Sequence, residues 1–272
     1  MKKSDMNKLI AIASITVALV GCGGGGSSAT THVIALMGQS NMVGVFTATD
    51  APYTPSPSIK HLTLDNRLVE SNGQLYSTPS NYTELFTTTS EGPGMAFAEE
   101  LLSRLPAGDS IVLVPCARGG SSMAEQTLDN TTNIFNMHFP RSLLDVCQER
   151  IAIALTLSEG TFDGTVYYQG ESDAHLPSID DYGYWGDGLS LIRETLADQF
   201  GSNNLVMMQI ANFLGRTPEQ DAQWDAFKQY QTIWAVENDV QMVYTDDQPM
   251  GDIIHLSIEG AREVGKRAAA VF

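Results

Sequence analysis

Five short apolar stretches alternate with amphipathic helical stretches along most of this 272-residue chain, and this alternation constrains the fold more than any other feature. We predict strands at Val33–Met37, Ile111–Val114, Thr165–Tyr168, Leu205–Ile210 and Val240–Tyr244. We predict helices at Gly94–Arg104, Arg141–Leu157, Gly188–Phe200, Pro218–Val236 and Ile258–Val271. Strands that alternate with helices pair in parallel, with helices on both faces. The pattern therefore predicts a three-layer α/β/α sandwich around a five-stranded parallel sheet.

One domain accounts for the mature chain. No internal repeat is visible, and we place the domain at residues 32–272. Residues 46–90 are rich in Thr, Ser, Pro and Asn, so we expect a long irregular excursion that either lacks regular structure or contains a small hairpin. Its aromatic residues either stack on a ligand or pack inside the domain; they are Phe46, Tyr53, Tyr76 and Tyr82.

Composition and charge exclude some classes of protein. A hydrophobic fraction of 43% and a charged fraction of 17% are those of a folded globular protein. The formal net charge of -17 argues against a nucleic-acid partner, because binding to phosphate requires a basic surface. The same acidity favours neutral substrates over negatively charged ones.

The N-terminus resembles an export signal. Residues 1–22 have a basic start and an apolar stretch that is too short for a comfortable membrane span. The stretch ends in Leu-Val-Gly-Cys and is similar to a bacterial lipobox, in which Cys22 would be lipidated. Residues 23–31 are a flexible Gly/Ser-rich tether, so we expect an exported outer-membrane lipoprotein. The alternative is a plain secretory signal.

The remaining cysteines, Cys116 and Cys147, either form a disulfide or pack as two buried thiols. No Cys/His spacing suits zinc, so we expect no metal and no cofactor. The oligomeric state is left open.

Chemically capable residues follow the predicted strands, at the edge where ligands bind in such sheets. Ser40 comes directly after the first strand in a Gly-Gln-Ser-Asn turn, where its hydroxyl could act as a nucleophile. The alternative is a simple helix cap. After the second strand, Gly119 and Gly120 could direct N–H groups toward an oxyanion, or could form an ordinary turn.

After the third strand, Gln169 could donate its amide to the same oxyanion, while Glu171 either orients a base or caps a loop. Asp252 and His255 follow the fifth strand as an Asp-x-x-His pair. A serine hydroxyl needs an adjacent imidazole, and the imidazole needs an acid to hold it. Together these segments supply the parts of an acyl-transfer site. His175 is the only rival base.

The motifs resemble those of the sialate O-acetylesterase-like (SASA) family, which includes the acetylxylan esterases of carbohydrate esterase family 6 and belongs to the SGNH-hydrolase superfamily. The resemblance spans nearly the whole mature chain and is carried by Gly38–Met42, Gly92-Pro93, Gly119–Ser121, Gln169–Ser172 and Asp252–Leu256. It implies a flavodoxin-like domain that removes acetyl groups from sugar hydroxyls without a cofactor.

The resemblance also implies roles for individual residues. Ser40 would be the nucleophile and His255 the base, and the oxyanion hole would comprise the Ser40 N–H, Gly119 or Gly120 and the Gln169 amide. The acid would be Asp252, with Glu171 as the second choice. We expect further substrate contacts from Gln39, Asn41 and Arg118. The alternatives are a lipolytic or broad short-chain esterase, or a silent sugar-binding lipoprotein.

Overall fold

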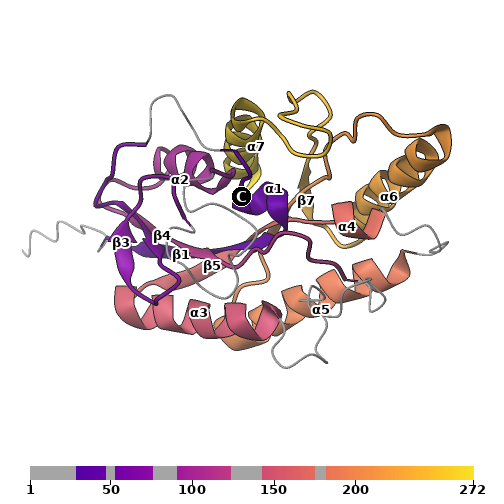
Figure 1. The fold of residues 1–272 in the computed structure, drawn as a ribbon. Coiled ribbons are helices and arrows are strands. Elements are labelled where there is room, and N and C mark those ends of the chain that lie inside the picture. The colour runs from indigo at the N-terminus through magenta and orange to yellow at the C-terminus, as the bar shows by residue number, and fades with distance from the viewer. Residues whose placement is uncertain (1–28, 47–52, 76–90, 124–142, 175–181) are drawn as a thin grey trace, which may run out of the picture.

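The computed structural model describes residues 29–46, 53–75, 91–123, 143–174 and 182–272, which form a seven-stranded sheet between two layers of helices (Figure 1). The sheet has the order β3-β2-β4-β1-β5-β6-β7. Its strands are β1 (Thr31–Gly38), β2 (Ile59–Leu62), β3 (Leu68–Glu70), β4 (Ser110–Pro115), β5 (Thr161–Tyr168), β6 (Leu205–Met208) and β7 (Gln241–Val243). The five predicted strands are present, in the flavodoxin-like order β4-β1-β5-β6-β7.

The strand count of five was too low, because the excursion after residue 46 adds two strands. Strand β2 pairs in parallel with β4, and β3 pairs with β2 in antiparallel. The hairpin that we considered for this region therefore extends the main sheet. Strand β2 contains the polar residues Lys60 and His61, and β3 has only three residues, so neither has the apolar run that identified the other strands.

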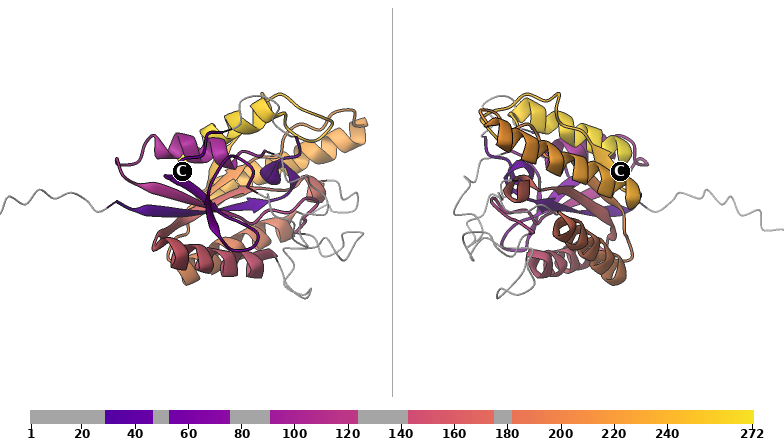
Figure 2. Two further views of the ribbon diagram at one scale, coloured as in Figure 1. Left: turned by 60° about the vertical axis from the view of Figure 1, so that its left-hand side comes forward. Right: turned by 90° about the vertical axis from the view of Figure 1, so that its right-hand side faces the viewer.

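The helices divide between the two faces of the sheet. Helices α2 (Gly94–Leu102) and α7 (Ile258–Val271) cover one face, while α3 (Leu143–Ser158) and α5 (Gly183–Phe200) cover the other (Figures 1 and 2). Helix α6 (Pro218–Glu237) packs Trp224, Phe227 and Trp234 into the core on the α3 and α5 side. Two short helices, α1 (Ser40–Val43) and α4 (Glu171–Ala174), directly follow β1 and β5. None of the described helices is long and apolar enough to span a membrane.

A disulfide and two hydrogen bonds connect helix α3 to the carboxyl ends of β4 and β2. Cys116 and Cys147 form a disulfide between the segment that follows β4 and helix α3, which settles the alternative that the sequence left open. Arg150, also on α3, donates hydrogen bonds to the carbonyls of Pro115 (3.0 Å) and Leu62 (2.8 Å). Helix α3 therefore fixes the carboxyl ends of β4 and β2 from the face of the sheet that it covers.

The amino edge of the sheet is closed by ion pairs. His32 contacts Asp163 through Nδ1 (2.5 Å) and Asp109 through Nε2 (3.2 Å). Asp109 also accepts a hydrogen bond from the Thr30 N–H. These contacts join the beginnings of β1, β4 and β5 at the edge from which the predicted tether extends.

Candidate active site

Ser40 lies on a tight turn between β1 and α1. Gly38 has φ +146°, and a side chain there would overlap the Tyr168 carbonyl on the neighbouring strand β5. Only glycine lets β1 and β5 approach this closely at their carboxyl ends. The Gln39 N–H then donates to the same Tyr168 carbonyl (2.9 Å), and the chain turns into α1 with Ser40 as its first residue.

His255 and Asp252 meet Ser40 from a loop after β7. The His255 Nε2 atom lies 3.0 Å from Ser40 Oγ, and its Nδ1 atom lies 2.8 Å from Asp252 Oδ2. The second oxygen of Asp252 accepts hydrogen bonds from the backbone N–H groups of Ile254 (2.8 Å) and His255 (2.7 Å). The Asp-x-x-His segment therefore folds into a small turn that presents acid and imidazole in line with the serine hydroxyl.

The two candidate acids have different environments. Partial burial raises the pKa of Asp252, but hydrogen bonds from Ile254 and His255 lower it more, so Asp252 is held as a carboxylate. Glu171 is 1% exposed, and burial raises its pKa above the usual range. His255 is joined to Asp252 by a direct hydrogen bond. Glu171 has no such bond to His255; within the described part of the chain, Asn41 is the one neighbour that hydrogen-bonds to its side chain.

The glycine pair lies against the serine turn. The Arg118 N–H (3.0 Å) and the Ser121 hydroxyl (3.1 Å) both donate to the carbonyl of Gly38, two residues before Ser40. Between them Gly120 has φ +71°, in the left-handed region. Within the described ranges, the N–H groups of Ser40, Gly119 and Gly120 donate to no protein acceptor. They are therefore available for an oxyanion.

The expectation that the Gln169 amide lines the oxyanion hole was wrong. Its side chain is completely buried, and Nε2 donates to the Ser121 carbonyl (3.0 Å) and to Asp173. Its Oε1 accepts from Tyr167 (2.9 Å) and Trp185 (2.8 Å). With both amide hydrogens engaged inside the core, Gln169 stabilises the loop and cannot donate to a substrate.

Asp173 holds the glycine loop in place, a role that sequence reasoning missed. It is completely buried and accepts hydrogen bonds from Ser122 (2.9 Å), the Met123 N–H (3.0 Å), Tyr184 (3.1 Å) and Gln169. Burial raises its pKa. Its position beside Glu171 in the Gln-Gly-Glu-Ser-Asp block was the only available signal, because its other partners come from two separate segments, residues 122–123 and Tyr184.

The three residues predicted to contact substrate differ in their surroundings. Gln39 is 3% exposed and its Oε1 accepts from the N–H groups of Gly170 (3.4 Å) and Ser172 (3.3 Å). Asn41 is 4% exposed and binds Glu171 and the His255 loop. The expected substrate contact of Asn41 is therefore replaced by contacts within the protein. For Gln39 these contacts engage only Oε1, and its Nε2 donates to no acceptor among the described residues, so its substrate contact stays a prediction. Arg118 is half-buried, and its Nε atom has no hydrogen-bond partner among the described residues.

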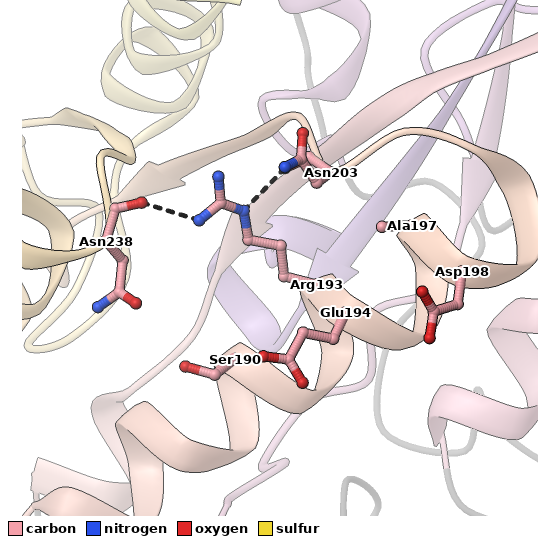
Figure 3. A pocket seen from close by; sticks show the side chains of 7 residues that line it. All are labelled: Ser190, Arg193, Glu194, Ala197, Asp198, Asn203 and Asn238. Carbon is pink, nitrogen blue, oxygen red and sulfur yellow. Dashed lines mark hydrogen bonds between the residues drawn. The ribbon is translucent and has the colours of Figure 1, made fainter.

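A surface pocket of about 420 Å³ lies beside helix α5 (Figure 3). It is lined by Ser190, Arg193, Glu194, Ala197, Asp198, Asn203 and Asn238. Arg193 donates to the backbone carbonyls of Asn203 (2.9 Å) and Asn238 (2.8 Å), which precede β6 and β7. The pocket therefore lies at the amino edge, opposite Ser40. The rival base His175 lies outside the described residues, as do Cys22, Tyr76 and Tyr82.

Comparison with known proteins gives a family and a set of similar folds. Residues 30–272 match the family described as carbohydrate esterase, sialic acid-specific acetylesterase. No curated protein matches the sequence.

Similar solved structures include a protein from Arabidopsis thaliana, with a TM-score of 0.68 and 24% identity over 88% of this chain and 96% of that one. NanS has a TM-score of 0.60 and 18% identity over 89% and 96%. A carbohydrate acetylesterase from Xanthomonas citri has a TM-score of 0.59 and 18% identity, over 88% of this chain and 55% of that one. At these identities the likeness shows a shared fold.

Proposed function

Because the chain belongs to the carbohydrate esterase family of sialic acid-specific acetylesterases, we propose that Ser40, His255 and Asp252 remove O-acetyl groups from sugars through an acetyl-enzyme. As a member of this family, the protein is an esterase that acts on acetylated carbohydrates. The proposal assigns that activity to three residues and a two-step route.

In the first step His255 accepts the proton of Ser40 while Oγ attacks the acetyl carbonyl carbon. The negative charge that develops on the carbonyl oxygen is stabilised by the free N–H groups of Ser40 and of Gly119 or Gly120. The imidazolium then gives its proton to the departing sugar oxygen, and the acetyl group stays on Ser40. In the second step His255 takes a proton from a water molecule whose oxygen attacks the acetyl carbonyl carbon. The bond between that carbon and Ser40 Oγ then breaks, the imidazolium returns the proton to Oγ, and acetate is released.

The single observation that carries this proposal is the line of hydrogen bonds from Asp252 through His255 to Ser40, with 2.8 and 3.0 Å between heavy atoms. Both distances lie within the range required for proton transfer. The acid fixes the tautomer that places the lone pair of Nε2 toward the hydroxyl, and it stabilises the imidazolium.

The test is to replace Ser40 by Ala and to measure acetate release from acetylated xylan, acetylated pectin and O-acetylated sialic acids. We expect the Ser40→Ala variant to fold normally and to lose hydrolysis on every substrate. Retained hydrolysis in this variant would exclude Ser40 as the nucleophile. The net charge of -17 favours neutral glycans within the panel.

Cleavage of longer acyl chains is a second candidate activity, because two exposed aliphatic residues lie next to the catalytic turn. Leu214 is 49% exposed and Ile253 is 59% exposed, and the Leu214 N–H donates to the Ile253 carbonyl (2.7 Å). A comparison of p-nitrophenyl acetate with p-nitrophenyl octanoate separates the two: an acetylesterase prefers the first, and a lipolytic enzyme prefers the second.

We also propose that the protein is an exported lipoprotein anchored through Cys22. The predicted signal and tether support this location. The first described residues lead into β1 at the amino edge, whereas Ser40 follows its carboxyl end, eight residues or roughly 26 Å further along. The site would therefore face away from the anchored end. Replacement of Cys22 by Ala should release the protein from the membrane fraction with its activity intact.

A further inference from the structure

Asn41 holds both peptide groups that flank His255. Its Nδ2 donates to the carbonyl of Ile254 (3.2 Å), and its Oδ1 accepts from the N–H of Leu256 (3.0 Å). Asn41 is also the residue directly after Ser40. A single side chain therefore joins the turn that carries the nucleophile to the loop that carries the base, although these segments are more than 200 residues apart.

Glu171 supplies the third contact of this amide. Its Oε1 accepts the second hydrogen of Asn41 Nδ2 at 2.6 Å, and both side chains are almost completely buried. A carboxylate or carboxyl oxygen accepts a hydrogen bond in either protonation state. The contacts to Ile254, Leu256 and Glu171 thus all select the same orientation of the Asn41 amide, because an inverted amide would present like groups to all three.

From this geometry we propose that Asn41 and Glu171 are positioning residues, which fix the distance between Ser40 and His255 by clamping the backbone on both sides of the imidazole. The proposal rests on the proposed function of Ser40 and His255, and it gives Glu171 a role different from that of triad acid. Neither residue needs to touch the substrate. The clamp acts on the ground-state geometry of the base, and a misplacement of about 1 Å is sufficient to reduce turnover by about 100-fold.

Two further contacts hold the loop that carries His255. A side chain built at Gly251, just before Asp252, would overlap the ring of Phe46, so this ring lies directly against the loop backbone. The Leu214 N–H donates to the Ile253 carbonyl. Within the loop, Gly251 and Asp252 also bond to the peptide groups next to His255. Among the described residues outside the loop, Asn41 is the one whose side chain bonds to both of these peptide groups.

The test is a charge-swap series measured with p-nitrophenyl acetate. The Asn41→Asp variant keeps the shape of the side chain but places oxygens against the Ile254 carbonyl and Glu171. We expect kcat to fall by about 100-fold with KM changed by less than about threefold. Adding Glu171→Gln places an amide N–H where the Glu171 carboxylate was, and this N–H can donate to the carboxylate introduced by Asn41→Asp. The double variant should therefore regain at least about tenfold in kcat.

A matched control is Gln209→Glu, which converts another buried amide into an acid. Gln209 Nε2 donates to the Lys228 carbonyl and to Thr232, away from the His255 loop. We expect this variant to lose stability while the folded protein keeps its kcat. Recovery in the double variant therefore reports the clamp and not general tolerance of buried charge.

The proposal is overturned if Asn41→Asp keeps kcat within about threefold of the unaltered protein, if the double variant regains nothing, or if the loss falls on KM alone. If Asn41→Asp does not fold, Asn41→Ala decides by the same limits on kcat and KM, since it removes the three contacts without adding charge. Ser40→Ala is assayed in parallel. An active Ser40→Ala variant refutes the proposed function, whereas an inactive one beside unaffected Asn41 variants refutes only the clamp.

Discussion

The two edges of the sheet differ in whether their polar groups have hydrogen-bond partners within the protein. At the amino edge both ring nitrogens of His32 contact carboxylates, and Arg193 is held by two backbone carbonyls. At the carboxyl edge, within the described ranges, the N–H groups of Ser40, Gly119 and Gly120 donate to no protein acceptor.

Two side chains at the carboxyl edge each have one buried atom without a hydrogen-bond partner among the described residues. These atoms are Glu171 Oε2 and Arg118 Nε. Buried polar groups without partners are costly, so a structure retains them where a ligand or a reaction uses them. We therefore interpret the amino edge as the one that stabilises the fold and the carboxyl edge as the one that carries the proposed chemistry.

The largest expected effect comes from a comparison of two histidines, one at each edge. The His255→Ala variant removes the base 3.0 Å from Ser40 Oγ, so kcat for p-nitrophenyl acetate should fall by about a million-fold while the fold is kept. The His32→Ala variant should keep kcat and lose thermal stability. A comparable loss of kcat in folded His32→Ala would contradict the division between the edges.

The next effect separates the two acids of the carboxyl edge. Asp252→Asn removes the charge that faces His255, and we expect kcat to fall by about 10⁴-fold. Glu171→Gln leaves an oxygen that can accept from Asn41, so its loss should stay below about 100-fold. Steady-state kinetics on both variants provide the measurement, and a larger loss in Glu171→Gln would make Glu171 the catalytic acid.

A smaller effect is expected from two glycines that share a conformation. Gly120 and Gly201 have φ +71° and +84°, and a methyl group at either position would meet no atom of the described residues within 4 Å. Alanine therefore adds a backbone strain of about 1–2 kcal/mol at each site and no overlap. At Gly120 it should also move a free N–H and lower kcat by about 10- to 100-fold. At Gly201, the C-cap of α5, it should lower only stability, as measured by urea unfolding. Equal kcat in both variants would exclude the Gly120 turn from the oxyanion hole.

The smallest effect concerns the pH dependence of the amino edge. Burial lowers the pKa of His32, but hydrogen bonds to Asp163 and Asp109 raise it more, so the net shift is upward. The stabilisation from protonated His32 is thus complete below the unfolded pKa of about 6.5 and is lost as pH rises through the folded pKa. The free energy of unfolding should exceed that of His32→Gln by on the order of 1 kcal/mol at low pH, and the gap should shrink toward pH 9. A gap that grows with rising pH would refute this account.

Part of this molecule could be predicted from its sequence, because the relevant signals are local. Apolar runs such as Val33–Met37 identify buried strands, and residues directly after parallel strands must gather at one edge, which brought Ser40, Gly119 and His255 together. The Asp-x-x-His pair is also local, since Asp252 binds backbone groups two and three residues later.

Other features depend on contacts that no local pattern reveals. Gln169 was misassigned because its position after β5 suggested a donor, whereas Trp185 and Asp173 turn its amide into the core. Asn41 was expected to contact substrate, although its partners are about 130 and 213–215 residues away. The direction of a polar side chain at the end of a strand is decided by such distant neighbours.

Labelling with a fluorophosphonate tests the central claim most directly, because such reagents form a stable bond with a serine oxygen activated by a neighbouring base. We predict complete loss of esterase activity with one label per molecule, located on Ser40 by peptide mass spectrometry, and no labelling of the His255→Ala variant. Complete inactivation with Ser40 unlabelled, or with the label on another residue, would contradict the account.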